Sequence, residues 1–320
     1  MTDAVDPRRA RTRSVLAAVL AVLMLVPAGI LFARVWDDVG ERRESTRLEQ
    51  RGVEYLAALS PLVSALAEAQ SSAVSGVATS GPSVAAAVDA VAAVDRRLGT
   101  ELRTRTRWTA LRQRIDALPE ASGGPLAVYR THVEATDLTL ALYDAVRTNS
   151  GLLRDPDNDL SQLQQAVAVD LPTTVVQVSR MGDLSRLVAE SGAAQRAQLS
   201  PQFGAAVLAV NTNVATLTDN LQAAVDDTDS TTLSGNLVTG LDTFRRGVEA
   251  LTRGANPGGA PDPATMATAQ SQLQIALTGL AGIAVREMSG LLDARLDELG
   301  TRRTETLAMG ALLALLAAAA

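Results

Sequence analysis

Acidic residues at every second position form the pattern in this chain that comes nearest to a metal site. Asp155, Asp157 and Asp159 have the spacing of the first ligands in an EF-hand calcium loop. Such a loop then needs a glycine and, at its twelfth position, a bidentate glutamate, but Leu160 and Ala166 stand at these two places. We therefore expect a turn whose side chains cap the neighbouring helices, and no metal site.

The arginines are the second candidate for binding chemistry, because a guanidinium group binds planar anions through paired hydrogen bonds. Between residues 96 and 114 many arginines lie two residues apart. That spacing distributes side chains around a helix, so most of them should be solvated. Arg103 and Arg107 are four residues apart and would share one face of a helix. Together with Arg51 and Arg180 they are our candidate ligand-binding residues, for a small anion or an organic acid.

Catalytic chemistry has little material in this sequence. The chain has no cysteine and one histidine, His132, so it lacks a thiol nucleophile and a histidine pair for zinc. A G-x-S-x-G nucleophile motif and a glycine-rich phosphate loop are also absent from the sequence. We expect no enzyme activity and no cofactor, and we interpret His132 as a surface or partly buried residue.

Charge and composition exclude a further class of function. The chain has 29 basic residues against 35 acidic ones, a net charge of −6, and aromatic residues make up 2% of it. Nucleic-acid binding normally needs a basic face and stacking aromatics, so we expect no nucleic-acid partner. Alanine, leucine and valine are abundant while isoleucine, phenylalanine and tyrosine are scarce, which favours helices over strands.

The run Ser14–Ala33 contains no charged residue and is flanked by Arg13 and Arg34. As a helix it would be about 30 Å long, the thickness of one hydrocarbon core. We interpret residues 14–34 as a transmembrane helix, with a cleaved signal peptide as the alternative. Four arginines precede the run, so residues 1–13 should form a cytoplasmic tail and residues 35–303 an extracytoplasmic domain at the cell membrane.

A second uncharged run, Leu307–Ala320, ends the sequence. Its fourteen residues would give about 21 Å of helix, which is too short to cross a membrane upright. We interpret residues 304–320 as the beginning of a second transmembrane helix that is truncated here. A frayed alanine-rich tail is the alternative.

Helical periodicity dominates the region between the two runs. Leu56, Leu59, Val63 and Leu66 follow one another at spacings of three and four, as on the buried face of a helix. Proline, glycine and aspartate clusters separate the helical segments. We expect an all-α fold: an elongated up-down helical bundle, or two stacked four-helix bundles. The predicted helices cover residues 36–76, 84–118 (loosened at Gly99), 126–153, about 159–191 (kinked at Leu171–Pro172), 193–226 (interrupted near Pro201), 230–253 and 264–300.

One segment resembles the outer helical sensor region of bacterial two-pass receptors, a group that includes chemoreceptors, sensor kinases and diguanylate cyclases. The matching positions are Asn149, Leu152, Leu153, Asp155, Pro156, Asp157 and Asp159, followed by Leu171 and Pro172. The sequence departs from the pattern at residues 160–162, where the family has paired tyrosines. The resemblance implies a sensor domain that works as a homodimer, and it leaves the type of output open.

These observations favour the ligand-sensing part of a membrane receptor, in which a bound ligand shifts the last helix and passes a signal across the membrane. The chain carries no output domain, so it would be a fragment or would need a cytoplasmic partner. The competing hypothesis is a membrane-anchored helical spacer or scaffold of the cell envelope. A sensor predicts polar side chains that face inward between helices, whereas a spacer predicts uninterrupted apolar faces.

Overall fold

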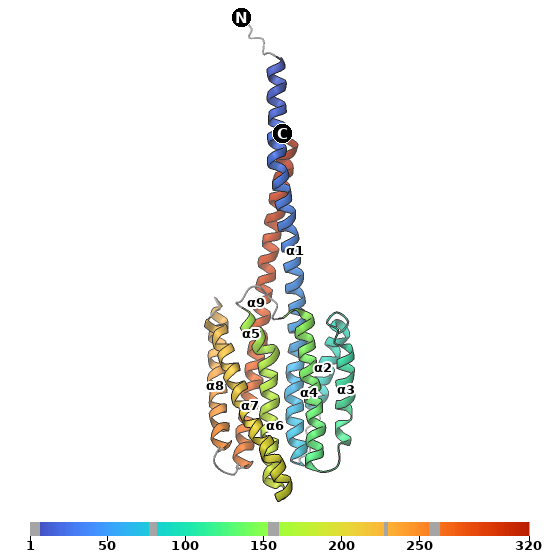
Figure 1. The fold of residues 1–320 in the computed structure, drawn as a ribbon, viewed down its shortest axis with the longest axis vertical. Helices are drawn as coiled ribbons and strands as arrows, with labels where there is room; N and C mark the ends of the chain where they lie inside the picture. The colour runs from blue at the N-terminus through green and yellow to red at the C-terminus, as the bar shows by residue number, and fades with distance from the viewer. Residues whose placement is uncertain (1–6, 77–81, 153–159, 227–229, 256–262, 320) are drawn as a thin grey trace. The chain divides into compact units, whose positions relative to one another are not determined.

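The structure is a computed structural model and describes residues 7–76, 82–152, 160–226, 230–255 and 263–319. These residues form helices and short turns, with no strand among them, which confirms the all-α prediction. The chain divides into two units (Figure 1). Unit 1 comprises Met1–Arg47 and Leu292–Ala320, and unit 2 comprises Leu48–Leu291.

The helices follow the predicted order closely. They are α1 (Pro7–Val74), α2 (Pro82–Leu98), α3 (Arg105–Asp116), the 3-10 turn η1 (Leu118–Glu120), α4 (Pro125–Ser150), α5 (Ser161–Gln165), the π-helical turn η2 (Ala166–Asp170), α6 (Leu171–Glu190), α7 (Ala193–Asp226), α8 (Thr231–Ala255) and α9 (Pro263–Ala319).

Pro61 and Pro201 lie inside helices without ending them, so the predicted interruption near Pro201 was wrong. Pro201 is inside α7, and Pro61 is likewise inside α1. A proline inside a helix deprives the carbonyl four residues earlier of its hydrogen bond. Those carbonyls belong to Ala57 and Ala197, which are both exposed, so water can replace the missing donor.

The predicted helix over residues 84–118 is two helices. α2 ends at Leu98, and the buried Asp95 holds the turn that follows. Its Oδ1 accepts hydrogen bonds from Thr104 Oγ1 at 2.7 Å and from Tyr55 OH at 2.8 Å. Arg103 lies in this turn with a φ of 51°. The expectation that Arg103 and Arg107 share a helix face was therefore wrong, because α3 begins only after Arg103.

The predicted kink at Leu171–Pro172 corresponds to the π-helical turn η2, which ends directly before Leu171. Pro172 is then the second residue of α6, where a proline is tolerated. The last residue of η2, Asp170, accepts hydrogen bonds from Gln165 at 3.1 Å and from Asn220 of α7 at 2.6 Å. These contacts fix the widened turn against the neighbouring helix.

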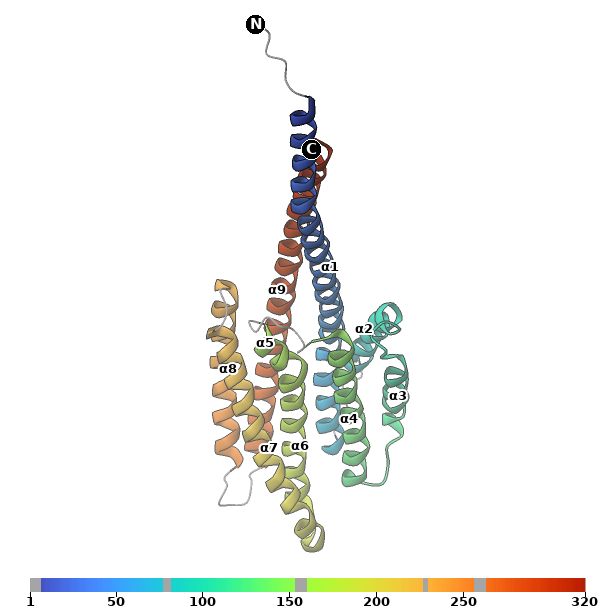
Figure 2. The ribbon, with the colours of Figure 1, turned by 45° about the horizontal axis from the view of Figure 1, so that its top comes forward.

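Within unit 2, the helices α1–α4 lie beside one another, and α6–α9 lie beside them as a second group (Figures 1 and 2). The predicted apolar face of α1 is the centre of the first group, since Leu56, Leu59, Val63 and Leu66 are all buried. In the second group, a side chain at Gly247 of α8 would press on Leu273 of α9, so these helices pack closely. Arg180 of α6 joins the groups through an ion pair with Asp137 of α4 at 2.6 Å.

Unit 1 contains the two ends of the chain, and its α1 and α9 segments are antiparallel. The Arg303 guanidinium lies 4.7 Å from the centre of the Trp36 ring, and the Phe32 ring stacks on Trp36 at 6.3 Å. A Cβ atom at Gly310 would overlap with the Phe32 ring. Because lower residue numbers of α1 meet higher numbers of α9, the two segments run in opposite directions.

Both segments of unit 1 expose large apolar side chains. Those more than half exposed are Leu23, Val26, Ile30, Leu31, Leu307, Met309, Leu312, Leu315 and Leu316. In the described part of the chain, one helical stretch, Ala264–Leu316, is long and apolar enough to cross a membrane, by length and composition alone. The side chains of residues 7–22 and Met24 lie outside the description, so a first crossing over residues 14–34 stays a prediction.

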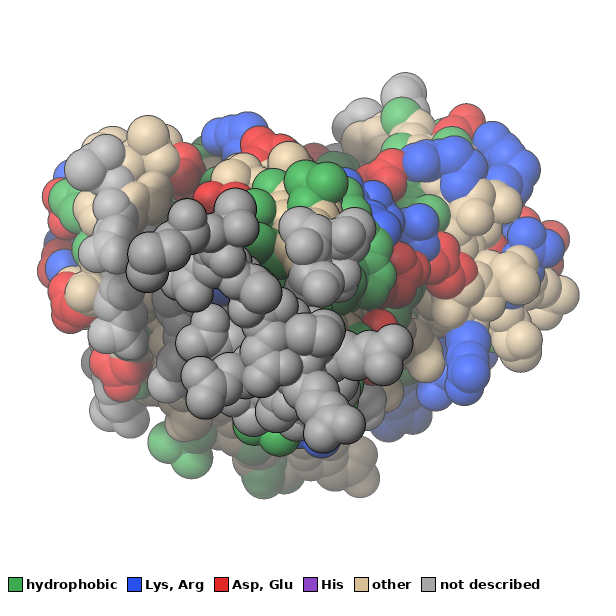
Figure 3. Space-filling model, turned by 90° about the horizontal axis from the view of Figure 1, so that it is seen from above, with side chains coloured by type: hydrophobic (Ala, Val, Ile, Leu, Met, Phe, Trp, Pro, Cys, Tyr) green, Lys and Arg blue, Asp and Glu red, His purple; other side chains and the backbone are tan. Residues whose placement is uncertain are grey.

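Charges of both signs are mixed on the surface around α2 and α3. Figure 3 shows arginines interspersed with acidic side chains over this part of unit 2. Arg97 pairs with Glu54, and Arg112 Nε lies 3.6 Å from Asp116 Oδ2. All four of these side chains are largely exposed, so the ion pairs add little stability.

Replacing Gly182 by alanine tests the close approach of α6 and α9. A Cβ atom at Gly182 would overlap with Oε1 of Gln270, whose Nε2 donates to Ser71 Oγ at 2.9 Å. Gly290→Ala is the matched control, because a Cβ atom there meets nothing within 4 Å. We expect Gly182→Ala to be less stable than Gly290→Ala by about 1–2 kcal/mol in thermal unfolding, through loss of the Gln270 hydrogen bond.

A second substitution, Gln270→Ala, tests whether the overlap with the Gln270 side chain causes the loss of stability. In the Gly182→Ala background it removes the obstructing amide and should recover part of the lost stability. Equal stability of Gly182→Ala and Gly290→Ala would contradict the packing described here.

Candidate functional site

The four arginines expected to bind a ligand do not form one site. Arg51 of α1 pairs with Glu101, and Arg103 and Arg107 are exposed. Arg180 of α6 is the one that points inward, with 15% of its side chain exposed. None of the four lines the polar cavity that the structure places between α1, α6 and α9.

Arg180 is already occupied by protein groups. Its Nη2 donates to Asp137 Oδ1 at 2.6 Å, to Thr136 Oγ1 at 2.8 Å and to the Val133 carbonyl at 3.3 Å. Its Nε is buried and has no partner among the described residues. With Asp137 neutralising its charge, Arg180 serves to hold α6 against α4.

The residues that carry the family resemblance are mostly outside the description. Asp155, Pro156, Asp157 and Asp159 fall in the segment 153–159, about which the structure gives nothing. Asn149 is described, and its Nδ2 donates to the Ala145 carbonyl at 2.8 Å, a bond within α4. The resemblance therefore stays a prediction.

A polar cavity lies in unit 2 between α1, α6 and α9. Its volume is about 490 Å³, in the range of small-molecule sites. Eleven of its fifteen lining residues are serine, threonine, glutamine or charged residues. The lining residues are Ser64, Ala67, Glu68, Ser71, Ser72, Ser75, Gly182, Asp183, Arg186, Ala267, Gln270, Ser271, Gln274, Ile275 and Thr278.

Asp183 is the buried charged group of this cavity, with 3% of its surface exposed. Its Oδ2 accepts a hydrogen bond from Gln70 Nε2 of α1 at 2.7 Å. Burial raises the pKa of Asp183 to about 6, although the Gln70 hydrogen bond and the Arg186 charge act in the opposite direction. A carboxyl group with this pKa changes its charge close to neutral pH.

Two glutamines of α9 bring amide groups to the same cavity. Gln270 Nε2 donates to Ser71 Oγ at 2.9 Å, and Gln274 Nε2 donates to the Val175 carbonyl at 2.9 Å. Gln274 Oε1 is buried and accepts no hydrogen bond from any described residue. This oxygen is covered by the protein itself, so its missing hydrogen bond is a cost of about 1–3 kcal/mol within the fold.

The charge at the cavity is negative on balance. Asp183 and Glu68 are two carboxyl groups, and Arg186 is the one cation among the lining residues. Arg186 is itself engaged, since its Nε donates to Glu190 at 2.9 Å and its Nη1 contacts Ser75 Oγ. The cavity therefore offers acceptors more than donors, and it favours a ligand that brings its own N–H or O–H groups.

Sequence reasoning missed this cavity, although a signal for it exists. Ser64, Ser71 and Ser75 fall on one face of α1, and Gln270 and Gln274 are four residues apart on α9. The apolar periodicity of both helices predicted only their core faces. Polar residues repeated at helical spacing beside a core face would have indicated the cavity.

Comparison with protein-family models, with curated proteins and with solved structures found no match to this chain.

The raised pKa of Asp183 predicts a pH dependence of stability. The folded state holds this proton more tightly than the unfolded chain, in which the pKa is 3.8. The resulting stabilisation is complete below pH 4 and is lost as the pH rises through about 6, a change of about 3 kcal/mol. We expect Asp183→Asn, which cannot ionise, to lack this loss of stability in thermal unfolding of the full chain between pH 4 and 7.5.

Asp219→Asn is the matched control, because Asp219 is exposed on α7. Its pH profile should follow that of the wild type. Parallel profiles for the wild type and Asp183→Asn would show that Asp183 titrates normally and would contradict its burial.

Proposed function

We propose that this chain is the ligand-sensing part of a bacterial membrane receptor and that the polar cavity of unit 2 is its ligand site. One observation carries the proposal: α1, α6 and α9 leave a cavity of about 490 Å³ with hydroxyl, amide and carboxyl groups on its wall. A spacer needs no such cavity, and uninterrupted apolar faces would make it more stable.

The ligand that suits this cavity is a small molecule rich in hydrogen-bond donors, such as a primary amine. Asp183 and Glu68 supply negative charge, and the serine and threonine hydroxyl groups of the wall supply further acceptors. An organic anion, the class expected from the arginines, would meet only Arg186, which already pairs with Glu190. Charge complementarity therefore favours the amine.

The membrane topology proposed for the chain has two crossings. Residues 1–13 form a cytoplasmic tail, residues 14–34 the first crossing, residues 35–303 the extracytoplasmic domain and residues 304–320 the start of the second crossing. Support comes from the exposed apolar side chains of unit 1 and from Trp36 and Arg303, residue types that favour the membrane surface. We further propose that the two groups of helices in unit 2 are two four-helix bundles side by side and that the sensor domain acts as a homodimer.

Signalling follows from ligand contact with α9. A ligand shifts a conformational equilibrium only by its difference in affinity for the two states. Gln270 and Gln274 are on α9, whereas Asp183 is on α6 and Ser71 on α1, so a ligand that bridges them favours one register of α9. Since α9 continues from the cavity into the terminal apolar run, a change of its register is a signal that a cytoplasmic partner or output domain can receive.

A ligand screen tests the proposal. Thermal unfolding of the purified full chain in detergent is measured with ethanolamine, putrescine and glucosamine, and with nitrate and succinate for comparison. We expect at least one amine to raise the melting temperature as its concentration increases, because it binds only the folded state. In Glu68→Gln the affinity for this amine should fall about 10- to 100-fold, the effect of losing a hydrogen bond to a charged group.

Glu249→Gln is the matched control, the same substitution at an exposed position of α8 that does not line the cavity. It should leave the affinity unchanged. If no compound of either class binds the folded chain, the scaffold hypothesis takes the place of the sensor. If a ligand binds equally well to Glu68→Gln, the site assignment is wrong.

A further inference from the structure

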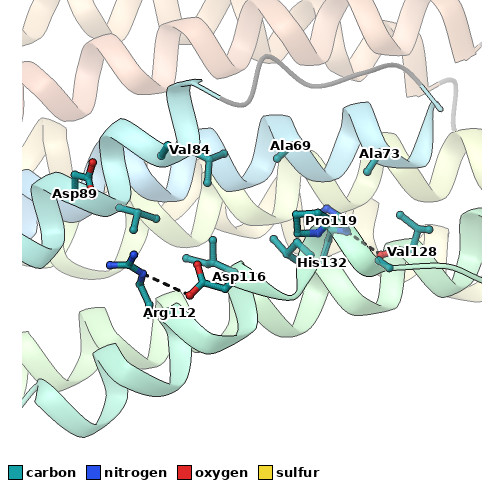
Figure 4. Close-up of a pocket in the computed structure, with 14 residues that line it drawn as sticks. Ala69, Ala73, Val84, Asp89, Arg112, Asp116, Pro119, Val128 and His132 are labelled. Atoms are coloured by element: carbon teal, nitrogen blue, oxygen red, sulfur yellow. Dashed lines mark hydrogen bonds and ion pairs between the residues drawn. The ribbon is translucent and has the colours of Figure 1, made fainter.

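A second cavity lies in unit 2 among α1, α2, α3 and α4 (Figure 4). Its volume is about 580 Å³, again in the range of small-molecule sites. Ten of its fourteen lining residues are alanine, valine, isoleucine, leucine or proline, and Ala69 and Ala73 form the α1 wall. This wall is the face of α1 opposite to Ser71 and Ser75, so the two cavities are separate.

His132 is the buried polar residue of this second cavity, with 5% of its surface exposed. Its Nδ1 lies 3.0 Å from the Val128 carbonyl oxygen (Figure 4). A carbonyl can only accept, so Nδ1 carries the proton. Burial lowers the pKa of His132, which keeps the ring neutral at neutral pH. Nε2 is then an acceptor, and no described residue donates a hydrogen bond to it.

The other polar lining residues lie toward solvent. Arg112 and Asp116 have side chains that are 44% and 63% exposed, and their charged atoms are 3.6 Å apart. Asp89 is also exposed. Figure 4 shows these three side chains on α2 and α3, with His132 on α4. The inner part of the cavity therefore presents apolar walls and one acceptor, His132 Nε2.

We propose that this cavity is a second ligand site, which binds an uncharged, largely apolar ring molecule with one hydrogen-bond donor directed at His132 Nε2. The apolar walls stabilise a ring by removing it from water. They disfavour an ion, because a buried charge without a partner loses its hydration. The donor supplies specificity, since the neutral imidazole has one acceptor to satisfy.

This site is independent of the proposed sensing of a polar ligand. No residue of the polar cavity lines it, and the chemistry that it selects is apolar and uncharged. Failure of the amine screen would leave the His132 site unaffected, and failure of the experiment below would leave the polar cavity unaffected.

The test uses 5-fluoroindole, which has an N–H donor, and 1-methyl-5-fluoroindole, which lacks it. Binding to the full chain in detergent is followed by fluorine NMR, with Ala73→Leu in the same detergent as the reference for partitioning into micelles. We expect saturable binding of 5-fluoroindole to the wild type, about 3- to 10-fold tighter than that of the methylated probe. Ala73→Leu fills the cavity and should abolish saturable binding of both probes.

His132→Phe gives a second criterion that does not depend on the Ala73 variant. It keeps a ring at position 132 and removes the acceptor, so both indoles should bind it with equal affinity. Circular dichroism establishes that each variant is folded; if Ala73→Leu is not, the ratio of the two affinities in His132→Phe decides. The proposal is overturned if the wild type binds neither probe, binds both equally, or keeps its preference in His132→Phe.

Discussion

The hydrogen bond from Gln70 to Asp183 places a carboxyl group where water is largely excluded, and the packing of α1 against α6 must keep the two together. If α1 slid by one turn, about 5 Å, Asp183 would stay buried but lose its hydrogen bonds from Gln70 and Ser71 of α1. Gln270 adds α9 to the same network through Ser71. The network thus determines the relative register of three helices, and the apolar contacts of Leu59 or Leu66 alone would tolerate more than one.

The two cavities of unit 2 lie on opposite sides of the last turns of α1. Ala69 and Ala73 face the apolar cavity, whereas Ser71 and Ser75 face the polar one. Small side chains on both faces explain why neither side is filled, because alanine and serine leave space that leucine would occupy. The backbone of these turns therefore forms part of the wall of both cavities. The last turns of α1 are therefore the part of the fold through which the two sites could influence each other.

The sequence predicted the helices well where their boundaries depend on local chemistry. The apolar spacing of Leu56, Leu59 and Val63 indicated the buried face of α1, and proline, glycine and aspartate clusters indicated most helix ends. The division between α2 and α3 depends instead on Tyr55, forty residues from Asp95, and local patterns do not contain that contact.

The same limit applies to the prediction of the candidate site. Gln70 and Asp183 are far apart in sequence, so their meeting depends on tertiary packing. The arginines are conspicuous in the sequence, but Arg51 is paired at the surface and Arg180 between helices.

The central claim is that the polar cavity binds a ligand, and hydrogen exchange of the full chain tests it most directly. Amide exchange is measured by mass spectrometry with and without the amine that raises the melting temperature most. The account predicts slower exchange in three segments, residues 64–75, 171–186 and 263–278, and no change in residues 84–116. Slower exchange in residues 84–116, or no change in the three cavity segments while the amine is bound, would contradict it.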